Sequence, residues 1–111
     1  MNTSFELQED GVIVMNVAGE VDVFAAAEFK DGLFRCLDQG VRRLIIDMTG
    51  AGFIDSTGLG VLVAGVKHAR GSEMAIVCDE ATLGRIFAIV GLDKVFSVYG
   101  DRGAALRGAP L

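Results

Sequence analysis

The sequence predicts an α/β fold, in which helices alternate with buried strands. Three observations predict it. The N-terminal segment has the alternating and then apolar pattern of a β-hairpin. Residues 41–48 and 74–78 contain the short apolar runs typical of strands covered on both faces. Between these runs, apolar residues recur at i, i+3, i+4 and i+7, the spacing of a helix. We therefore expect a strand, a helix and a strand in succession, which form a right-handed βαβ unit.

The first elements expected are the hairpin and a helix. Residues 5–8 and 12–18 form the two strands, and the three residues between them form the turn. The chain then leaves the strand, and Asp22 can cap a helix that ends at Gly40, because glycine is favoured just past a helix C-terminus. The apolar residues that recur at helical spacing in this segment are Phe29, Leu33, Cys36 and Leu37.

A central helix is expected to start near Ser56, after a flexible loop over residues 49–52. Asp55, Ser56 or Thr57 could each be its N-cap, because their side chains can accept hydrogen bonds from the first helical turn. Glycines are poor helix formers, costing roughly 1 kcal/mol each relative to alanine. We interpret the two in this helix, Gly58 and Gly60, as leaving the hydroxyl groups accessible to the backbone of another protein.

The C-terminal part predicts a third helix, a short strand over residues 95–99 and a helical turn or two over residues 101–107. Asp79 or Thr82 opens the third helix and Gly91 ends it. Its expected apolar face comprises Leu83, Ile86, Phe87 and Val90. With 111 residues the chain is expected to be a single domain, residues 1–111, with a loose tail over residues 108–111.

Composition excludes several classes of function. The net charge is −5 and the basic residues are scattered, which disfavours direct binding of DNA or RNA. No apolar run approaches the roughly 20 residues that span a bilayer, and no signal peptide is evident, so we expect a cytoplasmic protein. Cys36 and Cys78 have neither metal-ligand nor redox-motif spacing and are expected to be buried; with His68 they predict no metal site.

The segment from residue 53 to residue 62, Phe-Ile-Asp-Ser-Thr-Gly-Leu-Gly-Val-Leu, resembles the signature of the STAS domain family, in particular the bacterial anti-sigma factor antagonists. The resemblance implies the STAS fold, a small mixed β-sheet with helices packed mainly against one face. In that family the serine directly after the aspartate is phosphorylated by a partner kinase. Here that residue is Ser56. The segment Gly-Glu-Val-Asp at residues 19–22 resembles a family segment whose aspartate, here Asp22, lies beside the phosphorylation site.

The resemblance implies a partner-binding surface of seven residues: Asp22, Asp55, Ser56, Thr57, Gly58, Leu59 and Gly60. Asp22 has two compatible interpretations, since a carboxylate there could cap the first helix and also position the hydroxyl of Ser56. Asp55 has the same two interpretations. Thr57 is an alternative phosphate acceptor, and the resemblance, not the spacing, selects Ser56.

The resemblance implies a partner-switching regulator rather than an enzyme. The unphosphorylated form binds an anti-sigma factor that is also a serine kinase and thereby frees a sigma factor for transcription. Phosphorylation of Ser56 ends the binding, and a serine phosphatase reverses it. An enzymatic role for Ser56 is disfavoured because His68 lies twelve residues along the same helix, roughly 18 Å away. No phosphate-binding loop is present and no cofactor is predicted. The alternative is a non-catalytic accessory subunit of a transporter ATPase or of a larger signalling assembly.

Overall fold

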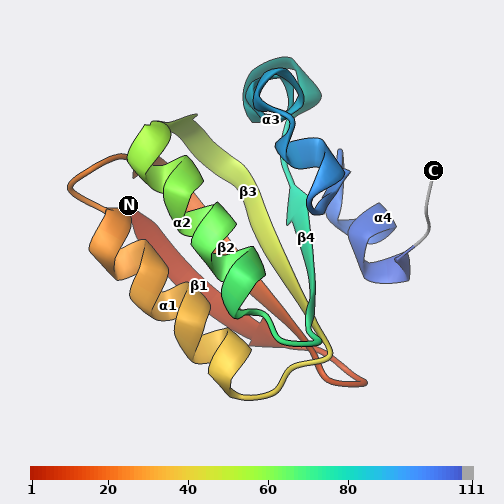
Figure 1. Cartoon of the computed structure of the whole chain (residues 1–111). Helices are drawn as coiled ribbons and strands as arrows, with labels where there is room; N and C mark the ends of the chain where they lie inside the picture. The colour runs from red at the N-terminus through yellow and green to blue at the C-terminus, as the bar shows by residue number, and fades with distance from the viewer. Residues whose placement is uncertain (109–111) are drawn as a thin grey trace.

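The computed structural model describes residues 1–108, which form one five-stranded sheet with helices on both faces (Figure 1). The strands lie in sequence order across the sheet. β1 runs antiparallel to β2, and the other neighbours run parallel. The mixed sheet confirms the predicted fold class. The strands are β1 (Asn2–Leu7), β2 (Val12–Val21), β3 (Arg43–Ile54), β4 (Glu73–Val77) and β5 (Ser97–Tyr99).

Two long helices, α1 (Ala26–Asp38) and α2 (Ser56–His68), cover one face of the sheet, and the short helix α4 (Arg102–Arg107) lies against the other face (Figure 1). The main core lies beneath α1 and α2. All four apolar residues predicted for the first helix are buried there. Within α1, a Cβ on Gly32 would lie 3.1 Å from Met15 and 3.2 Å from Phe5, so the glycine lets the helix approach β1 and β2 closely.

β2 and β3 are longer than the sequence predicts. β2 continues to Val21 instead of ending at residue 18, and β3 continues through the expected loop over residues 49–52. The loop prediction was therefore wrong. Two register irregularities keep the strands paired, and at the second one Gly19 adopts a φ of +91° that favours glycine. Gly50 lies against Ala18 on the paired strand, so the glycine in this segment serves close packing rather than flexibility.

The third helical segment is also more complex than predicted. Asp79, not Thr82, caps it by accepting a hydrogen bond from the Ala81 amide over 2.8 Å. It opens with a π-helical turn, η1 (Glu80–Gly84), and continues as α3 (Arg85–Val90). Because a π turn shifts the helical phase, Leu83 and Phe87 are buried as predicted but Val90 is half exposed. The prediction that Val90 belongs to the buried face was wrong.

After α3, Gly91 ends the helix in a left-handed conformation as predicted, and a 3₁₀ turn, η2 (Leu92–Lys94), follows. This turn delays the last strand, which begins at Ser97 rather than residue 95. Asp101 caps α4, which ends at Arg107 and is followed by Gly108 in a left-handed conformation. The remaining residues of the predicted loose tail, 109–111, lie outside the described residues.

α4 is held to the back of the sheet by a polar cluster in which Asp47 is buried and Glu6 and Arg102 are partly exposed. The guanidinium of Arg102 donates to Asp47 over 3.0 Å and to Glu6 over 2.8 Å, and it also bonds the side chain of Asn16. Burial alone would raise the pKa of Asp47, but hydrogen bonds from Thr49 and then Arg102 outweigh it and the pKa is lowered. The pKa of Glu6 is likewise lowered, by hydrogen bonds from Asn16 and Arg102. The cluster therefore remains charged at neutral pH.

A second arginine, Arg43, also holds α4 against the back of the sheet. Arg43 is buried and donates to the backbone carbonyl of Ala105 in α4 and to the Tyr99 hydroxyl over 3.3 Å. Its Nε lies 3.5 Å from Glu73. None of the helices within residues 1–108 is long and apolar enough to cross a membrane.

Candidate functional site

The candidate site lies at one end of the sheet, where β2 and β3 end and both long helices begin (Figure 1). Val21 and Ile54 are paired in the register of β2 and β3, so the residues that follow them emerge side by side. The Asp55 amide also donates to the Val21 carbonyl. This topology brings Asp22 to the same edge as Asp55 and Ser56, although they are far apart in the sequence. Ligand and partner sites commonly lie at the carboxyl ends of parallel strands.

Asp55 is the N-cap of α2. Its backbone is extended, and its Oδ1 accepts a hydrogen bond from the Gly58 amide over 3.0 Å. Ser56 is therefore the first helical residue and Thr57 the second. Both are exposed, and among residues 1–108 no hydrogen bond to the Ser56 hydroxyl is found. The hydroxyl group stands free in solvent at the positive end of a helix dipole.

Asp22 closes the turn that leads into α1. Its Oδ1 accepts hydrogen bonds from the amides of Phe24 over 3.0 Å and Ala25 over 3.1 Å. The helix itself starts at Ala26, and its N-cap residue, Ala25, makes no side-chain cap. The carboxylate thus caps the turn before the helix rather than the first helical turn, which corrects the expected position of the cap.

The two glycines of the predicted surface have different environments. A Cβ on Gly58 would lie 2.7 Å from the Ile54 side chain, and this glycine is buried. Gly60 is exposed, and a Cβ there would meet nothing within 4 Å. Leu59 is partly buried and packs against the main core. Gly58 therefore serves internal packing, and only Gly60 offers the accessible backbone that both glycines were expected to provide.

Three exposed apolar side chains flank the site and were missed by the sequence analysis. Phe24 is 93% exposed, Val23 is 58% exposed and Phe53 is 47% exposed. Phe53 precedes the cap by two residues and is paired with Glu20 across β2 and β3. A signal was present in the sequence, because Val23 and Phe24 are out of phase with the apolar face of the helix that follows them. Such residues lie outside the core and are available to a partner.

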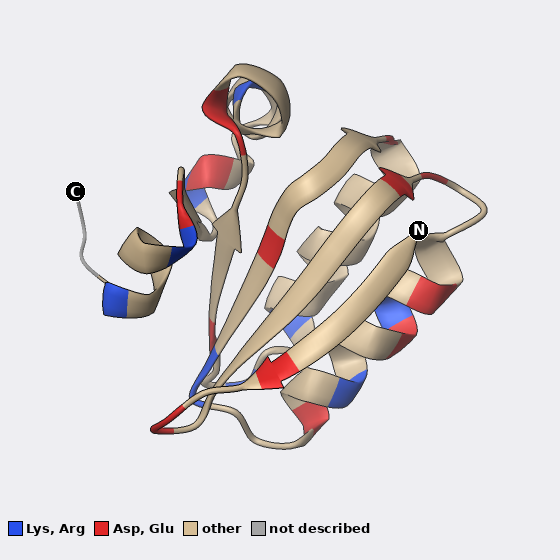
Figure 2. Ribbon diagram, turned by 180° about the vertical axis from the view of Figure 1, so that it is seen from behind, with Lys and Arg blue, Asp and Glu red and all other residues tan. Residues whose placement is uncertain are grey.

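The surface beside these residues is acidic. Glu20, Asp22 and Glu28 line a hollow of about 380 Å³ together with Met1, Phe24 and Ala25, so three carboxylates outnumber the N-terminal ammonium group of Met1. Figure 2 shows the acidic residues at the end of β2 and in the loop that follows. Asp55 adds a further carboxylate at the neighbouring strand end. A negative group added to Ser56 would therefore enter a region that already carries negative charge.

The residues needed for catalysis or metal binding are not gathered at this end. His68 lies at the opposite end of α2, stacked on Phe34 with ring centroids 4.2 Å apart and 2.6 Å from the Asp38 carboxylate. Cys36 and Cys78 are buried free thiols. Among residues 1–108, no three His, Cys, Asp or Glu side chains are placed to hold a metal ion. The geometry here suits binding and modification rather than bond cleavage by the protein.

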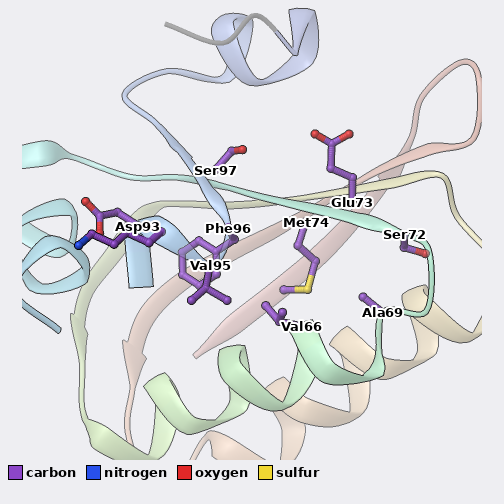
Figure 3. A pocket seen from close by; sticks show the side chains of 10 residues that line it. Val66, Ala69, Ser72, Glu73, Met74, Asp93, Val95, Phe96 and Ser97 are labelled. Carbon is purple, nitrogen blue, oxygen red and sulfur yellow. The ribbon is translucent and has the colours of Figure 1, made fainter. Parts of the chain in front are cut away.

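A separate groove of about 340 Å³ lies between the C-terminal half of α2, β4 and the segment before β5 (Figure 3). Val66, Met74 and Phe96 provide apolar walls, whereas the Glu73 carboxylate points to the other side of β4. It contains none of the seven predicted site residues.

Comparison with known proteins identifies the family. Residues 6–105 match the family model of the STAS domain. The chain belongs to the STAS domain family. A relative from Listeria monocytogenes, the anti-sigma-B factor antagonist, is 35% identical over 108 residues, which cover 93% of this chain and 94% of that protein. Anti-sigma factor antagonists are non-catalytic binding proteins, in agreement with the prediction that this STAS domain is not an enzyme.

Solved structures show the same fold. The crystal structure of an anti-sigma factor antagonist from Mycobacterium paratuberculosis has a TM-score of 0.89 at 28% identity, covering 96% of this chain and 92% of that one. The antagonist SpoIIAA in its unphosphorylated form has a TM-score of 0.77 at 17% identity, covering 99% of this chain and all of that one. The phosphorylated form of Bacillus SpoIIAA has a TM-score of 0.72 at 19% identity, covering 97% and 100%. The SpoIIAA comparisons establish the STAS fold.

Proposed function

We propose that this STAS domain is a cytoplasmic anti-sigma factor antagonist that works by partner switching. The unphosphorylated form binds an anti-sigma factor with serine kinase activity and so frees a sigma factor. Phosphorylation of Ser56 ends the binding, and a serine phosphatase restores it. The observation that carries the proposal is the position of Ser56, exposed and without a hydrogen-bond partner at the start of α2. The naming of the Listeria relative supports the class of partner.

A phosphoryl group on Ser56 is compatible with the folded domain. The first turn of a helix carries about half a positive charge and free N–H groups, which tolerate or favour an added anion. The existing cap is provided by Asp55, so modification of Ser56 removes no capping bond. The effect of the modification would therefore be felt by the partner rather than by the fold.

The surroundings of Ser56 suit a protein interface. Phe24 and Phe53 offer exposed apolar area beside it, and Gly60 leaves the next turn of α2 bare. A kinase must bring its nucleotide phosphates close to this hydroxyl to modify it. If a carboxylate or nucleotide phosphate of the partner lay ~5 Å from the new phosphoryl group, repulsion at an effective dielectric of ~20 would approach ~3 kcal/mol per unit charge. That corresponds to roughly a hundredfold loss of affinity.

The test measures the affinity of a purified anti-sigma factor kinase for the unmodified protein, Ser56→Ala and Ser56→Asp. We expect Ser56→Ala to bind like the unmodified protein and Ser56→Asp to bind roughly a hundredfold more weakly. Equal affinities for the two variants would refute the charge mechanism.

Mapping the phosphorylated residue distinguishes Ser56 from Thr57 as the acceptor. Incubation with the kinase and ATP should add one phosphoryl group, ~80 Da, to the unmodified protein and to Thr57→Ala but not to Ser56→Ala. A phosphoryl group found on Thr57 would overturn the assignment to Ser56. Co-purification with transporter ATPase subunits, without any phosphorylated form, would favour the accessory-subunit alternative.

A further inference from the structure

The outer edge of β1 carries unpaired backbone groups. β1 is the first strand of the sheet and pairs only with β2. The Gln8 amide donates to the Val12 carbonyl over 2.8 Å, so the residues in phase with Gln8 bond inward to β2. The alternate residues, Thr3, Phe5 and Leu7, therefore direct their N–H and C=O groups away from the sheet. These groups form a regular ladder that another strand can complete.

Apart from the charge of Glu6, which Arg102 binds on the back of the sheet, the described part of β1 has little that protects this edge. β1 contains no proline, lysine or bulge, the features that natural sheets use to prevent edge pairing. On the α1 side, Leu7 is 81% exposed and Phe5 is 49% exposed. Both line a groove of about 290 Å³ whose other wall is α1, including Gly32 and Arg35. The edge thus combines unpaired backbone groups with exposed apolar side chains.

We propose that the outer edge of β1 pairs antiparallel with β1 of a second copy of this chain, with the two-fold axis at Phe5. In this register Phe5 faces Phe5 of the second copy, and Thr3 faces Leu7 of the second copy. Every outward N–H and C=O of these three residues then has a partner. The two sheets join into one continuous sheet, and none of the paired residues belongs to the candidate site around Ser56, so the pairing does not depend on the proposed function.

The side chains that face each other across the two β1 strands favour a second copy paired in this register. On the α1 side, Phe5 packs against Phe5 of the second copy, and Leu7 packs against the methyl group of Thr3. Both are favourable cross-strand pairs. On the back of the sheet, Ser4 faces Glu6 of the second copy. The Ser4 oxygen already accepts from Asn16, so its O–H is left to donate to that carboxylate. The register centred on Glu6 instead would oppose two carboxylates, which is destabilising.

The charges on α1 add little attraction under the same two-fold axis. Arg35 lines the groove beside Leu7 and is already paired with Asp31 of its own helix over 3.2 Å, whereas Glu28 lies near Met1 at the other end of β1. The axis sets α1 antiparallel to its copy and turns each Arg35–Asp31 pair toward the Glu28 end of the second copy. Because each chain carries a net charge of −5, the attraction between the copies has to come from the strand edges and their side chains.

Sedimentation velocity on the full chain tests the proposal. A short edge-to-edge interface belongs to the weak class, below about 1,200 Å², so concentrations from ~10 µM to ~1 mM are appropriate for a transient dimer. We expect the mass to rise with concentration toward twice the chain mass of 11.7 kDa. Leu7→Lys should weaken the dimer at least ~10-fold because it places a hydrated charge against the pairing edge. Phe24→Lys, which adds the same charge to another exposed apolar residue, should leave the dimer unchanged.

Amide hydrogen exchange locates the interface. The amides of Thr3, Phe5 and Leu7 should become protected as the concentration rises, while that of Phe24 should not. A protein that remains monomeric throughout the range would overturn the proposal. So would a dimer that Leu7→Lys leaves intact, or one in which these three amides exchange at the monomer rate. Because Leu7 is mostly exposed, the variant retains the fold, which circular dichroism verifies.

Discussion

The carbonyl oxygen of Val21 lies 2.8 Å from the point where a Cβ on Gly58 would stand. No side chain larger than hydrogen fits between the end of β2 and the first turn of α2. The absence of a side chain lets that turn sit directly on the strand end, where the Asp55 amide also bonds Val21. This contact fixes the height of Ser56 above the sheet, so a residue buried inside the domain determines how the exposed hydroxyl is presented.

Gly58→Ala should destabilise the domain by about 2 kcal/mol, because the methyl group overlaps a backbone carbonyl that cannot move freely. Gly60→Ala provides the matched control on the same helix. It meets open space, so the better helix propensity of alanine should stabilise the domain by ~0.5 to 1 kcal/mol. Urea denaturation of the two variants measures both changes. Changes of the same sign would contradict the difference in environment.

Substitution of Asp22 separates its structural role from its charge. Asp22→Asn retains an oxygen that can accept from the Phe24 and Ala25 amides, so stability should change by less than ~0.5 kcal/mol. Asp22→Ala loses both bonds and should cost ~1 kcal/mol. If the carboxylate also positions Ser56 for the kinase, Asp22→Asn should slow phosphorylation without lowering the melting temperature. If the stable Asp22→Asn variant is phosphorylated at an unchanged rate, the only role of Asp22 is to cap the turn before α1.

The cluster around Arg102 predicts acid sensitivity. Glu6 and Asp47 both have pKa values below their ordinary values in the folded protein. A carboxyl group with a lowered folded-state pKa stabilises the protein above its unfolded-state pKa, and this stability is lost as the pH falls through the folded-state value. The melting temperature should therefore fall as the pH is lowered from about 5 to about 2.

Arg102→Ala should reduce this dependence. At neutral pH it should also cost about 2 kcal/mol, because it leaves the buried Asp47 carboxylate without its cation, at a site where the arginine is partly solvated. Arg107→Ala, an exposed arginine of the same helix, is the control and should leave the acid profile unchanged. If the melting temperature of Arg102→Ala still falls with pH as in the unmodified protein, other carboxylates cause the acid sensitivity.

The thiol of Cys78 should be inert in the native protein. Burial, followed by the nearby charges of Asp79 and Glu80, raises its pKa to about 11, and the residue is fully buried. Because the thiolate is the reactive form, alkylation with iodoacetamide at pH ~8 should be at least a hundredfold slower than in urea. Burial also raises the pKa of Cys36, which should be protected in the same way. Mass spectrometry of each cysteine peptide follows the reaction, and rapid labelling under native conditions would contradict the buried placement.

Local chemistry explains which features the sequence could predict. The start of α2 follows from the capping ability of Asp55 and the apolar period after it, both of which are local. The extension of β3 through residues 49–52 could not be predicted, because glycines there suggest a loop until Ala18 is known to lie beside Gly50. Exposure of Val90 depends on a π turn, which apolar spacing does not reveal.

The candidate site shows the same division. Ser56, Thr57 and Asp55 share one turn and are found by motif, whereas Asp22 joins them only through the pairing of β2 with β3. The contribution of Phe24 becomes visible only when its 93% exposure is known.

The ion pair between Glu6 and Arg102 joins residues separated by 96 positions. During synthesis, which proceeds from the N-terminus, the first strand must therefore wait for nearly the whole chain to leave the ribosome before this pair can form. Until then Val14 and Ile45 on the back of the sheet have no α4 to cover them, and the Asp47 carboxylate has no arginine. A nascent chain arrested before residue 102 would present this apolar face to the cell, which makes it a substrate for chaperones rather than a folded domain.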